Sequence, residues 1–357
     1  MTDADYMRMA LELAAKGAGS VSPNPMVGAV IVKDGEIIGK GYHKQYGGPH
    51  AERAALADCA ASPEGAALYV TLEPCCHHGK TPPCTDAILA GGIRKMVVGV
   101  RDPNPLMAGK GVAILRAAGI EVTEGLLEDE CRKLNEVFFH YIQTHTPYVV
   151  MKYAMTMDGM TATRTGQSKW ITGEAARARV HRDRGRYSAV MVGIGTVLAD
   201  DPLLTCRAEG GRNPVRIVCD THLRIPLDSQ LVKTAREVPT IIATVCTDEE
   251  KHRPLVDLGC QIITAPKKDG HIDLTALMAL LGKEKIDSVL VEGGGTLHRS
   301  FLQSGLVNKV QAYIAPKLFG DIDIPDQAAL LAGSRIECLG EDFLIESEVV
   351  QRVHGDH

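Results

Sequence analysis

Short apolar runs, each with the length of a single strand, recur along the chain and are separated by segments with helical spacing. Residues 66–72 (AALYVTL) and 95–100 (KMVVGV) are such runs, and a helical pattern follows each of them later in the chain. A strand covered on both faces reads as a continuous apolar run, and right-handed crossovers through helices connect such strands. The pattern therefore predicts an α/β fold with helices on both faces of a sheet.

The first part of the chain also carries clear local signals. Helical spacing predicts a helix over residues 3–16, which Gly17 ends. Residues 26–32 (MVGAVIV) predict a strand, and the Asp34-Gly35 turn joins it to a second strand as a hairpin. A single helix is expected over residues 128–143. Together these elements predict a three-layer sandwich of helices and one sheet.

The length of 357 residues favours two domains. We expect the boundary between Thr144 and Pro147, because Pro147 stops the preceding helix and a new strand follows. This gives domains at residues 1–145 and 146–357. The second domain repeats the order of strand, glycine-rich turn and helix at residues 187–202, 213–220, 239–245 and 287–305. Residues 309–320 and 342–353 predict a closing pair of strands.

Composition narrows the class of protein. The chain is 45% hydrophobic and 23% charged, with a net charge of -5 and no basic face, so a nucleic acid is a poor candidate for its partner. No apolar run has the length of a membrane span, and the N-terminus lacks the pattern of a signal peptide. We expect a cytoplasmic protein. Its ten cysteines are then better explained as metal ligands or catalytic groups than as disulfides.

The segment LEPCCHHGKTPPC, residues 72–84, offers more candidate ligands than one zinc ion needs. Zinc with three protein ligands and an open position activates water at neutral pH. Cys75 and Cys84 can supply two ligands, and His50 of PHAE supplies the third. Glu52 then matches the glutamate that carries protons in zinc nucleobase deaminases without binding the metal. A structural zinc knuckle would close four ligands and has no use for this glutamate.

The rest of the loop is predicted to contact substrate. Residues 76–83 are polar and basic and are expected at the rim of the metal site. Cys76 is not expected to bind the metal, because adjacent cysteines rarely point the same way. His77 and His78 fit substrate binding and simple exposure to solvent equally well.

Several motifs occur together and in a fixed order. SPNPMVGAVIV, HAE, EPC and TPPC stand in the first half, and KYAMTMDG, SKWITG, GTVLADDPLLT and VEGGGTL in the second. Over nearly its whole length the chain resembles the bacterial bifunctional deaminase–reductases of riboflavin biosynthesis. The resemblance implies zinc-dependent deamination of 2,5-diamino-6-(5-phosphoribosylamino)pyrimidin-4(3H)-one, then reduction of the ribosyl group by NADPH to give 5-amino-6-(5-phosphoribitylamino)uracil. It implies a cytidine-deaminase-like sandwich followed by a dihydrofolate-reductase-like α/β domain.

The same resemblance implies roles for individual residues. Zinc (Zn2+) falls on His50, Cys75 and Cys84, the proton shuttle on Glu52 and a substrate contact on Asn24. Cofactor contacts fall on Ala154, Trp170, Thr196, Asp200, Thr221, Gly294, Gly295, Thr296 and Leu297. Further substrate contacts fall on Ser168, Arg184, Leu204, Arg207 and Glu292. The sequence departs from the family at Cys76, Thr156-Met157 and Asp183. The family also suggests a homo-oligomer, either a dimer or a tetramer.

The chemistry of the second site agrees in part with these roles. The glycines of VEGGGTL let backbone N–H groups approach a diphosphate at a helix start, although a tight turn without a ligand explains them equally well. Forked arginine donors suit the phosphate of a sugar. Trp170, the only tryptophan, fits either a core position or a wall of the nicotinamide site. Lys152 is expected to orient the substrate or to form a buried ion pair.

Two other classes of protein share parts of this pattern. A zinc deaminase of nucleic-acid bases shares HAE and the cysteines, but the acidic balance and the second half argue against it. A non-catalytic, zinc-stabilised binding protein has no need of Glu52. A chain with one active domain is a further possibility, but both sets of motifs are complete, so we expect both domains to be active.

Overall fold

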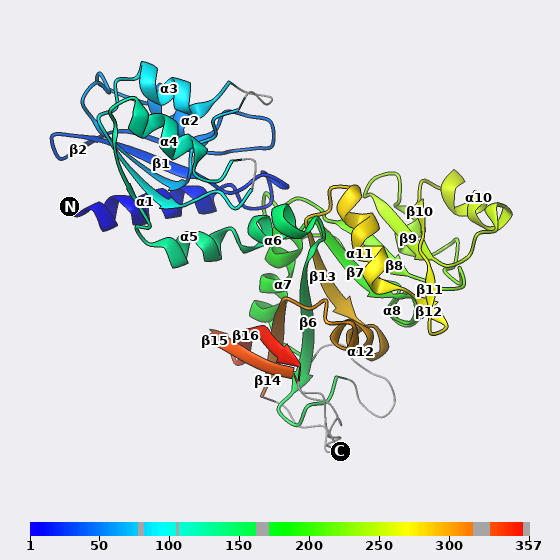
Figure 1. Ribbon diagram of the computed structural model, residues 1–357. Helices are drawn as coiled ribbons and strands as arrows, with labels where there is room; N and C mark the ends of the chain where they lie inside the picture. Colours follow the sequence, from blue (N-terminus) through cyan, green and yellow to red (C-terminus); the bar gives the residue numbers. More distant parts are fainter. Residues whose placement is uncertain (78–81, 105–106, 162–170, 317–328, 353–357) are drawn as a thin grey trace. The chain divides into compact units, whose positions relative to one another are not determined.

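The computed structural model describes residues 1–77, 82–104, 107–161, 171–316 and 329–352 (Figure 1). The chain divides into two compact units, Met1–His145 and Thr146–His357, and each has its own sheet. The mixed α/β class predicted from the alternating pattern is confirmed. Within the described ranges, none of the helices combines the length and the apolar character needed to cross a bilayer.

The first unit is built on a five-stranded sheet in the order β2-β1-β3-β4-β5. Its strands are β1 (Gly28–Lys33), β2 (Glu36–Tyr42), β3 (Ala67–Leu72), β4 (Lys95–Val100) and β5 (Glu121–Glu124). β1 runs antiparallel to β2 and β3, and β3, β4 and β5 are parallel. The predicted hairpin is confirmed, with Asp34 and Gly35 at φ 52° and 81° in the turn between β1 and β2.

Helices cover both faces of this sheet. They are α1 (Asp3–Ala15), α2 (Ala51–Ala57), α3 (Cys84–Ala90), α4 (Lys110–Ala117), α5 (Glu128–Leu134) and α6 (Glu136–Thr144). A Cβ on Gly28 would lie 1.9 Å from the Ala10 carbonyl oxygen in α1, and a Cβ on Gly41 would lie 2.4 Å from the Ala51 oxygen in α2. Because Gly41 pairs with Ala29, the neighbour of Gly28, the two glycines face opposite sides, and α1 and α2 form separate layers.

The single helix predicted over residues 128–143 is wrong, because the chain breaks at Asn135 between α5 and α6. The Asn135 side chain explains the break. Its Oδ1 accepts a bond of 2.8 Å from the Met26 N–H, and its Nδ2 donates one of 2.8 Å to the Met26 carbonyl. This buried amide thus pairs with distant backbone, which the helical periodicity of the sequence could not show.

The second unit is built on a nine-stranded sheet in the order β10-β9-β8-β7-β13-β6-β14-β16-β15. Its strands are β6 (Tyr148–Thr156), β7 (Ala189–Gly193), β8 (Val215–Cys219), β9 (Thr240–Thr244), β10 (Gln261–Thr264), β13 (Ser288–Gly293), β14 (Lys309–Ala315), β15 (Ala329–Leu339) and β16 (Asp342–Arg352). The predicted closing pair is confirmed as antiparallel β14 and β16, while the edge strand β15 was not predicted. The short strands β11 (Lys267–Lys268) and β12 (His271–Ile272) form a separate ribbon.

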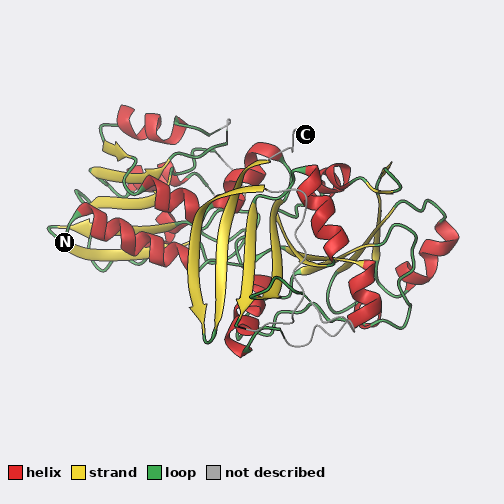
Figure 2. Cartoon of the chain, turned by 90° about the horizontal axis from the view of Figure 1, so that it is seen from below, coloured by secondary structure: helices red, strands yellow, loops and turns green. Residues whose placement is uncertain are grey.

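Side chains of alternate residues in the parallel strands pack into two different hydrophobic cores. Met191 and Ile217 pack in one cluster, whereas Val190 and Val218 pack in the other. Both faces of the part of the sheet built from β7 and β8 are therefore covered (Figure 2). The helices of this unit are α7 (Glu174–Arg186), α8 (Ile194–Asp200), α9 (Gln230–Lys233), α10 (Glu249–Asp257), α11 (Leu274–Lys283) and α12 (Gly295–Ser304).

Candidate active sites

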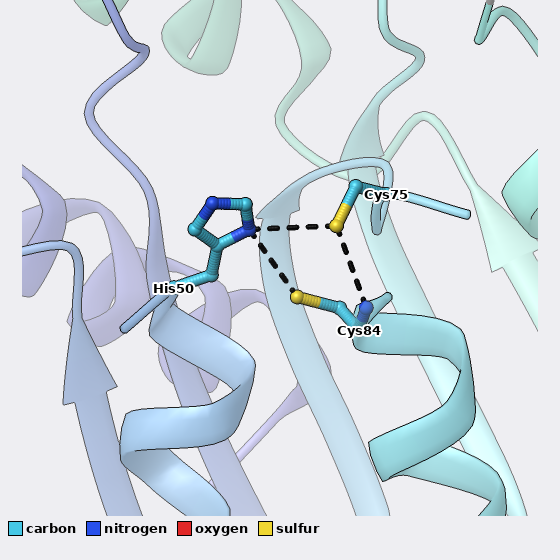
Figure 3. Close-up of side chains that lie close together, drawn as sticks. All are labelled: His50, Cys75 and Cys84. Carbon is cyan, nitrogen blue, oxygen red and sulfur yellow. Dashed lines mark hydrogen bonds between the residues drawn. The ribbon is translucent and has the colours of Figure 1, made fainter. Parts of the chain in front are cut away.

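His50, Cys75 and Cys84 lie together in the first unit (Figure 3). His50 Nδ1 is 3.4 Å from the sulfur of Cys75 and 3.4 Å from the sulfur of Cys84, and the three ligand atoms lie within 4.8 Å of one another. Tetrahedral zinc with bonds of about 2.3 Å to sulfur and about 2.0 Å to nitrogen separates such atoms by about 3.6 Å. The donor set and its spacing therefore fit zinc with one position left for another ligand.

Secondary structure brings these ligands together. His50 is the N-cap residue of α2, Cys84 is the first residue of α3, and Cys75 follows the end of β3. The Cys84 backbone N–H donates to the Cys75 sulfur at 3.4 Å. Hydrogen bonds from Cys84 and from His50 lower the pKa of the Cys75 thiol. The same contact between the cysteines raises the pKa of the Cys84 thiol, so the two sulfurs share one proton, whereas zinc binds both cysteines as thiolates.

Glu52 lies in the first turn of α2, two residues after the ligand His50, and its side chain is buried. It lines a cavity of about 300 Å³ together with Asn24 and His50. Burial raises the pKa of the Glu52 carboxyl above its ordinary value. A buried carboxyl beside the metal group is placed to accept a proton and to return it.

His43 orients Asn24 in this cavity. The Nδ1 of His43 faces the Pro49 carbonyl oxygen at 3.0 Å, so this nitrogen carries the proton. The Nε2 of the neutral ring then accepts from Asn24 Nδ2 at 3.3 Å, and burial lowers the pKa of His43 and favours this neutral form. The remaining amide oxygen of Asn24 is an acceptor suited to an N–H group of a bound pyrimidine.

Several residues of the cavity were not predicted from the sequence. Asp102 and Asn104 line it from the loop after β4, and Tyr46, Met107 and Phe138 add further walls. The DPNP motif after an apolar strand was the available signal for the first two, because carboxyl ends of parallel strands commonly carry binding groups. Of the two loop histidines, His77 lines the cavity, and His78 lies outside the described residues.

The second unit contains a larger cavity of about 1040 Å³. Most of the predicted reductase residues line it: Lys152, Ala154, Arg184, Thr196, Asp200, Leu204, Arg207 and Glu292. Ser168 and Trp170 lie outside the described residues, so the two interpretations of Trp170 remain predictions. The structure therefore gathers in one cavity residues that come from β6, α7, α8, β13 and the loop after α8.

A buried ion pair lies at the wall of this cavity. The Glu292 carboxylate accepts two bonds from Arg184, of 2.6 Å and 2.9 Å, and Lys152 Nζ lies 3.8 Å from it. Burial by itself raises the pKa of Glu292, but the charge and hydrogen bonds of Arg184 outweigh it and lower the pKa to about 2. Burial lowers the pKa of Lys152. Glu292 thus fixes two cations beside the cavity.

The glycine-rich turn starts α12 next to this cavity without lining it. Gly294 has φ 84°, and a Cβ there would lie 3.6 Å from Thr196 Oγ1, so the turn adjoins a residue of the cavity wall. A Cβ on Gly295 would meet no heavy atom within 4 Å among the described residues, which leaves the start of α12 accessible to a diphosphate. The Leu297 side chain packs in the core, and Thr221 lies beyond the end of β8.

Two family models match the chain. Residues 1–100 match the cytidine and deoxycytidylate deaminase zinc-binding region, and residues 147–341 match the RibD C-terminal domain. The first match contains all of the candidate zinc ligands, and the second contains the residues around the larger cavity.

Relatives match over almost the full length. The riboflavin biosynthesis protein RibD of Actinobacillus pleuropneumoniae is 53% identical, over 98% of this chain and 96% of the relative. That of Escherichia coli is 43% identical, over 90% of this chain and 89% of the relative. A solved deaminase/reductase of Thermotoga maritima has a TM-score of 0.85 at 40% identity, and RibD of Acinetobacter baumannii has 0.86 at 39%; each covers 98% of this chain and 99% of the solved chain.

The deaminase fold with its cysteine-and-histidine metal group, followed by a reductase fold, defines a bifunctional zinc deaminase and reductase. The two cavities lie in separate units. The chain belongs to the RibD family of riboflavin biosynthesis proteins. Its cofactors are zinc and NADPH, and small-molecule pyrimidines are the substrates that fit it.

Proposed function

We propose that residues 1–145 carry the deaminase and residues 146–357 the reductase. The observation that carries this division is the convergence of His50, Cys75 and Cys84 with Glu52 at one cavity of the first unit. The named substrates of the solved Thermotoga maritima relative support the same two reactions here. The first is hydrolysis of an amino group of the diaminopyrimidinone, and the second is reduction of the phosphoribosyl side chain to phosphoribityl.

In the deamination, water adds to the ring carbon and the C–N bond to the amino group breaks. Zinc held by the three ligands supplies Lewis-acid activation of water. Glu52 accepts the proton that water loses and returns it to the departing nitrogen, which leaves as ammonia. Asn24 accepts a hydrogen bond from the pyrimidine and holds the reacting carbon in place, since His43 fixes its amide.

In the reduction, the C=N bond of the opened sugar becomes C–N: its anomeric carbon takes a hydride, which bound NADPH would supply, and its nitrogen takes a proton from solvent. The residues of the second cavity bind and orient. Arg207 offers forked donors for the sugar phosphate, and the start of α12 adjoins Thr196, where a diphosphate can bind. Lys152 and Arg184, fixed by Glu292, orient the ribosyl group. Trp170 and Ser168 keep the cofactor and substrate roles that the family resemblance implies.

One experiment tests the division of activities. Purified full-length protein receives the diaminopyrimidinone, and ammonia release is followed separately from NADPH oxidation. The deaminated aminouracil, supplied directly, tests the reductase without the first step. Cys84→Ser should abolish ammonia release and leave NADPH oxidation with the aminouracil intact. Loss of both activities, or of neither, would contradict the division. Cytosine in a single-stranded oligonucleotide tests the nucleic-acid alternative, and we expect no ammonia from it.

Removal of the metal is expected to separate the two activities. A chelator such as dipicolinate should lower ammonia release by at least about 10²-fold, because the activated water is lost. NADPH oxidation with the aminouracil should stay within about twofold of the untreated enzyme, since the zinc ligands all lie in the first unit. Metal content by mass spectrometry and restoration of ammonia release by added Zn2+ complete the measurement. A parallel fall in both activities would contradict the assignment of the zinc site to the deaminase alone.

We also infer a cytoplasmic homo-oligomer, either a dimer or a tetramer, which is the state that the family resemblance implies. Light scattering on the purified protein measures its mass directly. A mass equal to the 38.3 kDa of one chain would contradict the oligomer.

A further inference from the structure

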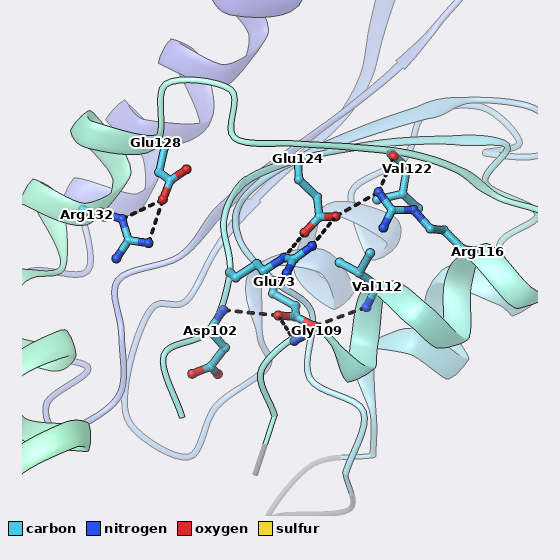
Figure 4. Close-up of polar contacts among 10 residues, drawn as sticks. Glu73, Asp102, Gly109, Val112, Arg116, Val122, Glu124, Glu128 and Arg132 are labelled. Atoms are coloured by element: carbon cyan, nitrogen blue, oxygen red, sulfur yellow. Dashed lines mark hydrogen bonds and ion pairs between the residues drawn. The ribbon is translucent and has the colours of Figure 1, made fainter. Parts of the chain in front are cut away.

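Glu73 is a buried carboxylate that follows β3 and stands two residues before Cys75. Its own N–H donates to the Val100 carbonyl at 2.9 Å, at the end of β4. Its side chain then reaches across to the next connection. The carboxylate accepts backbone N–H bonds from Asp102 at 3.2 Å, Gly109 at 2.9 Å and Val112 at 3.2 Å (Figure 4).

Two of these donors, Asp102 and Gly109, lie on the connection from β4 to α4, and the third, Val112, lies in the first turn of α4. Gly109 is the N-cap residue of α4, has φ 76° and brings no side chain to cap the helix. Glu73 Oε1 accepts from the Val112 N–H in the first turn of α4. Glu73, which follows β3, thereby caps the N-terminus of α4 in place of a side chain at Gly109. A Cβ on Gly111 would lie 2.2 Å from the Pro74 carbonyl oxygen, so α4 rests directly on the backbone that leads to Cys75.

The same connection forms one wall of the deaminase cavity. Asp102, Asn104 and Met107 line it, and Asp102 Oδ1 accepts the Asn104 N–H at 2.8 Å. Cys75, one of the metal-ligating group, and Glu73 itself line the same cavity. A single carboxylate therefore joins the backbone of the metal ligand to the backbone of the substrate wall.

Other carboxylates nearby make contacts of a different kind. Glu124 pairs with Arg101 and Arg116, and Glu128 pairs with Arg132, and these arginines are largely exposed. Glu73 instead accepts three backbone N–H bonds while nearly inaccessible to water. Charge-assisted bonds in such surroundings are strong, and they fix the position of a loop more firmly than exposed ion pairs do.

We propose that Glu73 is a positioning residue of the deaminase, which holds residues 102–104 and 107–109 at the distance from the metal ligands that substrate binding requires. This inference rests on the proposed function of the first unit. It assigns to Glu73 an effect on substrate affinity, with no part in the proton transfer of Glu52 and no part in binding the metal.

Glu73→Gln tests the proposal with little change of volume. The amide oxygen can still accept from Asp102 and Gly109, but the amide NH2 then faces the Val112 N–H, donor against donor. We expect the KM of the deamination to rise by about tenfold and kcat to change by less than about threefold. Zinc content and the reductase activity should stay unchanged, and the Asp102, Gly109 and Val112 amides should exchange hydrogen faster.

Glu128→Gln is the matched control, because it removes the charge of an exposed partner of Arg132 in the same unit. It should leave KM and amide exchange unchanged. Loss of zinc in Glu73→Gln would overturn the proposal, as would an unchanged KM. If Glu73→Gln does not fold, Gly111→Ala decides, because its Cβ displaces α4 from the Pro74 carbonyl. An unchanged KM in that variant would overturn the proposal too.

Failure of the positioning role of Glu73 is distinguishable from failure of the proposed deaminase function. Absence of ammonia release from the wild-type enzyme would remove the proposed function itself. Ammonia release that depends on Glu52 but not on Glu73 would leave the function standing and remove only the positioning role.

Discussion

Glu52→Gln is expected to lower ammonia release by about 10³-fold while the zinc content stays the same. Glu52 is 3% exposed, so an amide of nearly equal size keeps the packing of α2 against the metal group. The amide cannot accept a proton from water near neutral pH. The variant therefore loses an interaction that stabilises the transition state. We therefore expect kcat to fall and KM to change little. Ammonia release and metal content measured on the same preparation check both parts.

The reductase provides an internal control for this variant. With the aminouracil supplied directly, NADPH oxidation by Glu52→Gln should equal that of the wild type, because the larger cavity lies in the other unit. Glu128→Gln should leave both activities unchanged, since Glu128 pairs with Arg132 on the surface. Ammonia release within about tenfold of the wild type would remove Glu52 from the proton transfer.

Glu292→Ala should lower the free energy of unfolding of the second unit by about 3–5 kcal/mol and abolish the reductase. The Glu292 side chain is 5% exposed, and its removal leaves Arg184 and Lys152 close together without their anion. Urea unfolding, monitored by hydrogen exchange in peptides of the second unit, measures the change in the free energy of unfolding. Glu337→Ala, which removes an exposed partner of Arg179, should cost at most about 1 kcal/mol. Equal effects of the two substitutions would contradict the prediction.

The pH dependence of stability gives a separate test of the same ion pair. Glu292 has an ordinary pKa of 4.5, and its pKa in the folded protein is lowered to about 2. The stability that it contributes is therefore present above about pH 4.5 and is lost as the pH falls towards about 2. Glu292→Gln should remove this part of the acid dependence. An unchanged acid profile in that variant would contradict the lowered pKa.

The fold and the metal group were open to prediction because their signals are local. Apolar runs in alternation give the strands, and PHAE and EPC place ligands at the start of α2 and after β3. Zinc chemistry restricts which residue types can be ligands, so few combinations of His50, Cys75 and Cys84 had to be considered. Their assembly in space follows from strand and helix ends that meet at one edge of the sheet.

Contacts to distant backbone could not be predicted in this way. Asn135 pairs with Met26 across 109 positions, and Glu73 reaches Val112 across 39. A glutamate or asparagine that binds backbone N–H groups selects no particular partner residue, so neither partner shows a matching sequence pattern. The break between α5 and α6 was missed for this reason. The edge strand β15 was missed because Gly333 and Ser334 interrupt its apolar run, at the point where its register against β16 shifts.

The pairing of Asn135 with Met26 also bears on the order in which the first unit can be completed during synthesis. The strand next to Met26 and the metal ligands leave the ribosome long before α6, which carries the cavity residue Phe138. A nascent chain of 100 residues thus holds the whole zinc-binding region but an open cavity. The cavity closes only when Asn135 emerges and pairs with Met26, so that α6 packs against the part of the unit that was synthesised first. A fragment designed to retain the deaminase must therefore extend through α6.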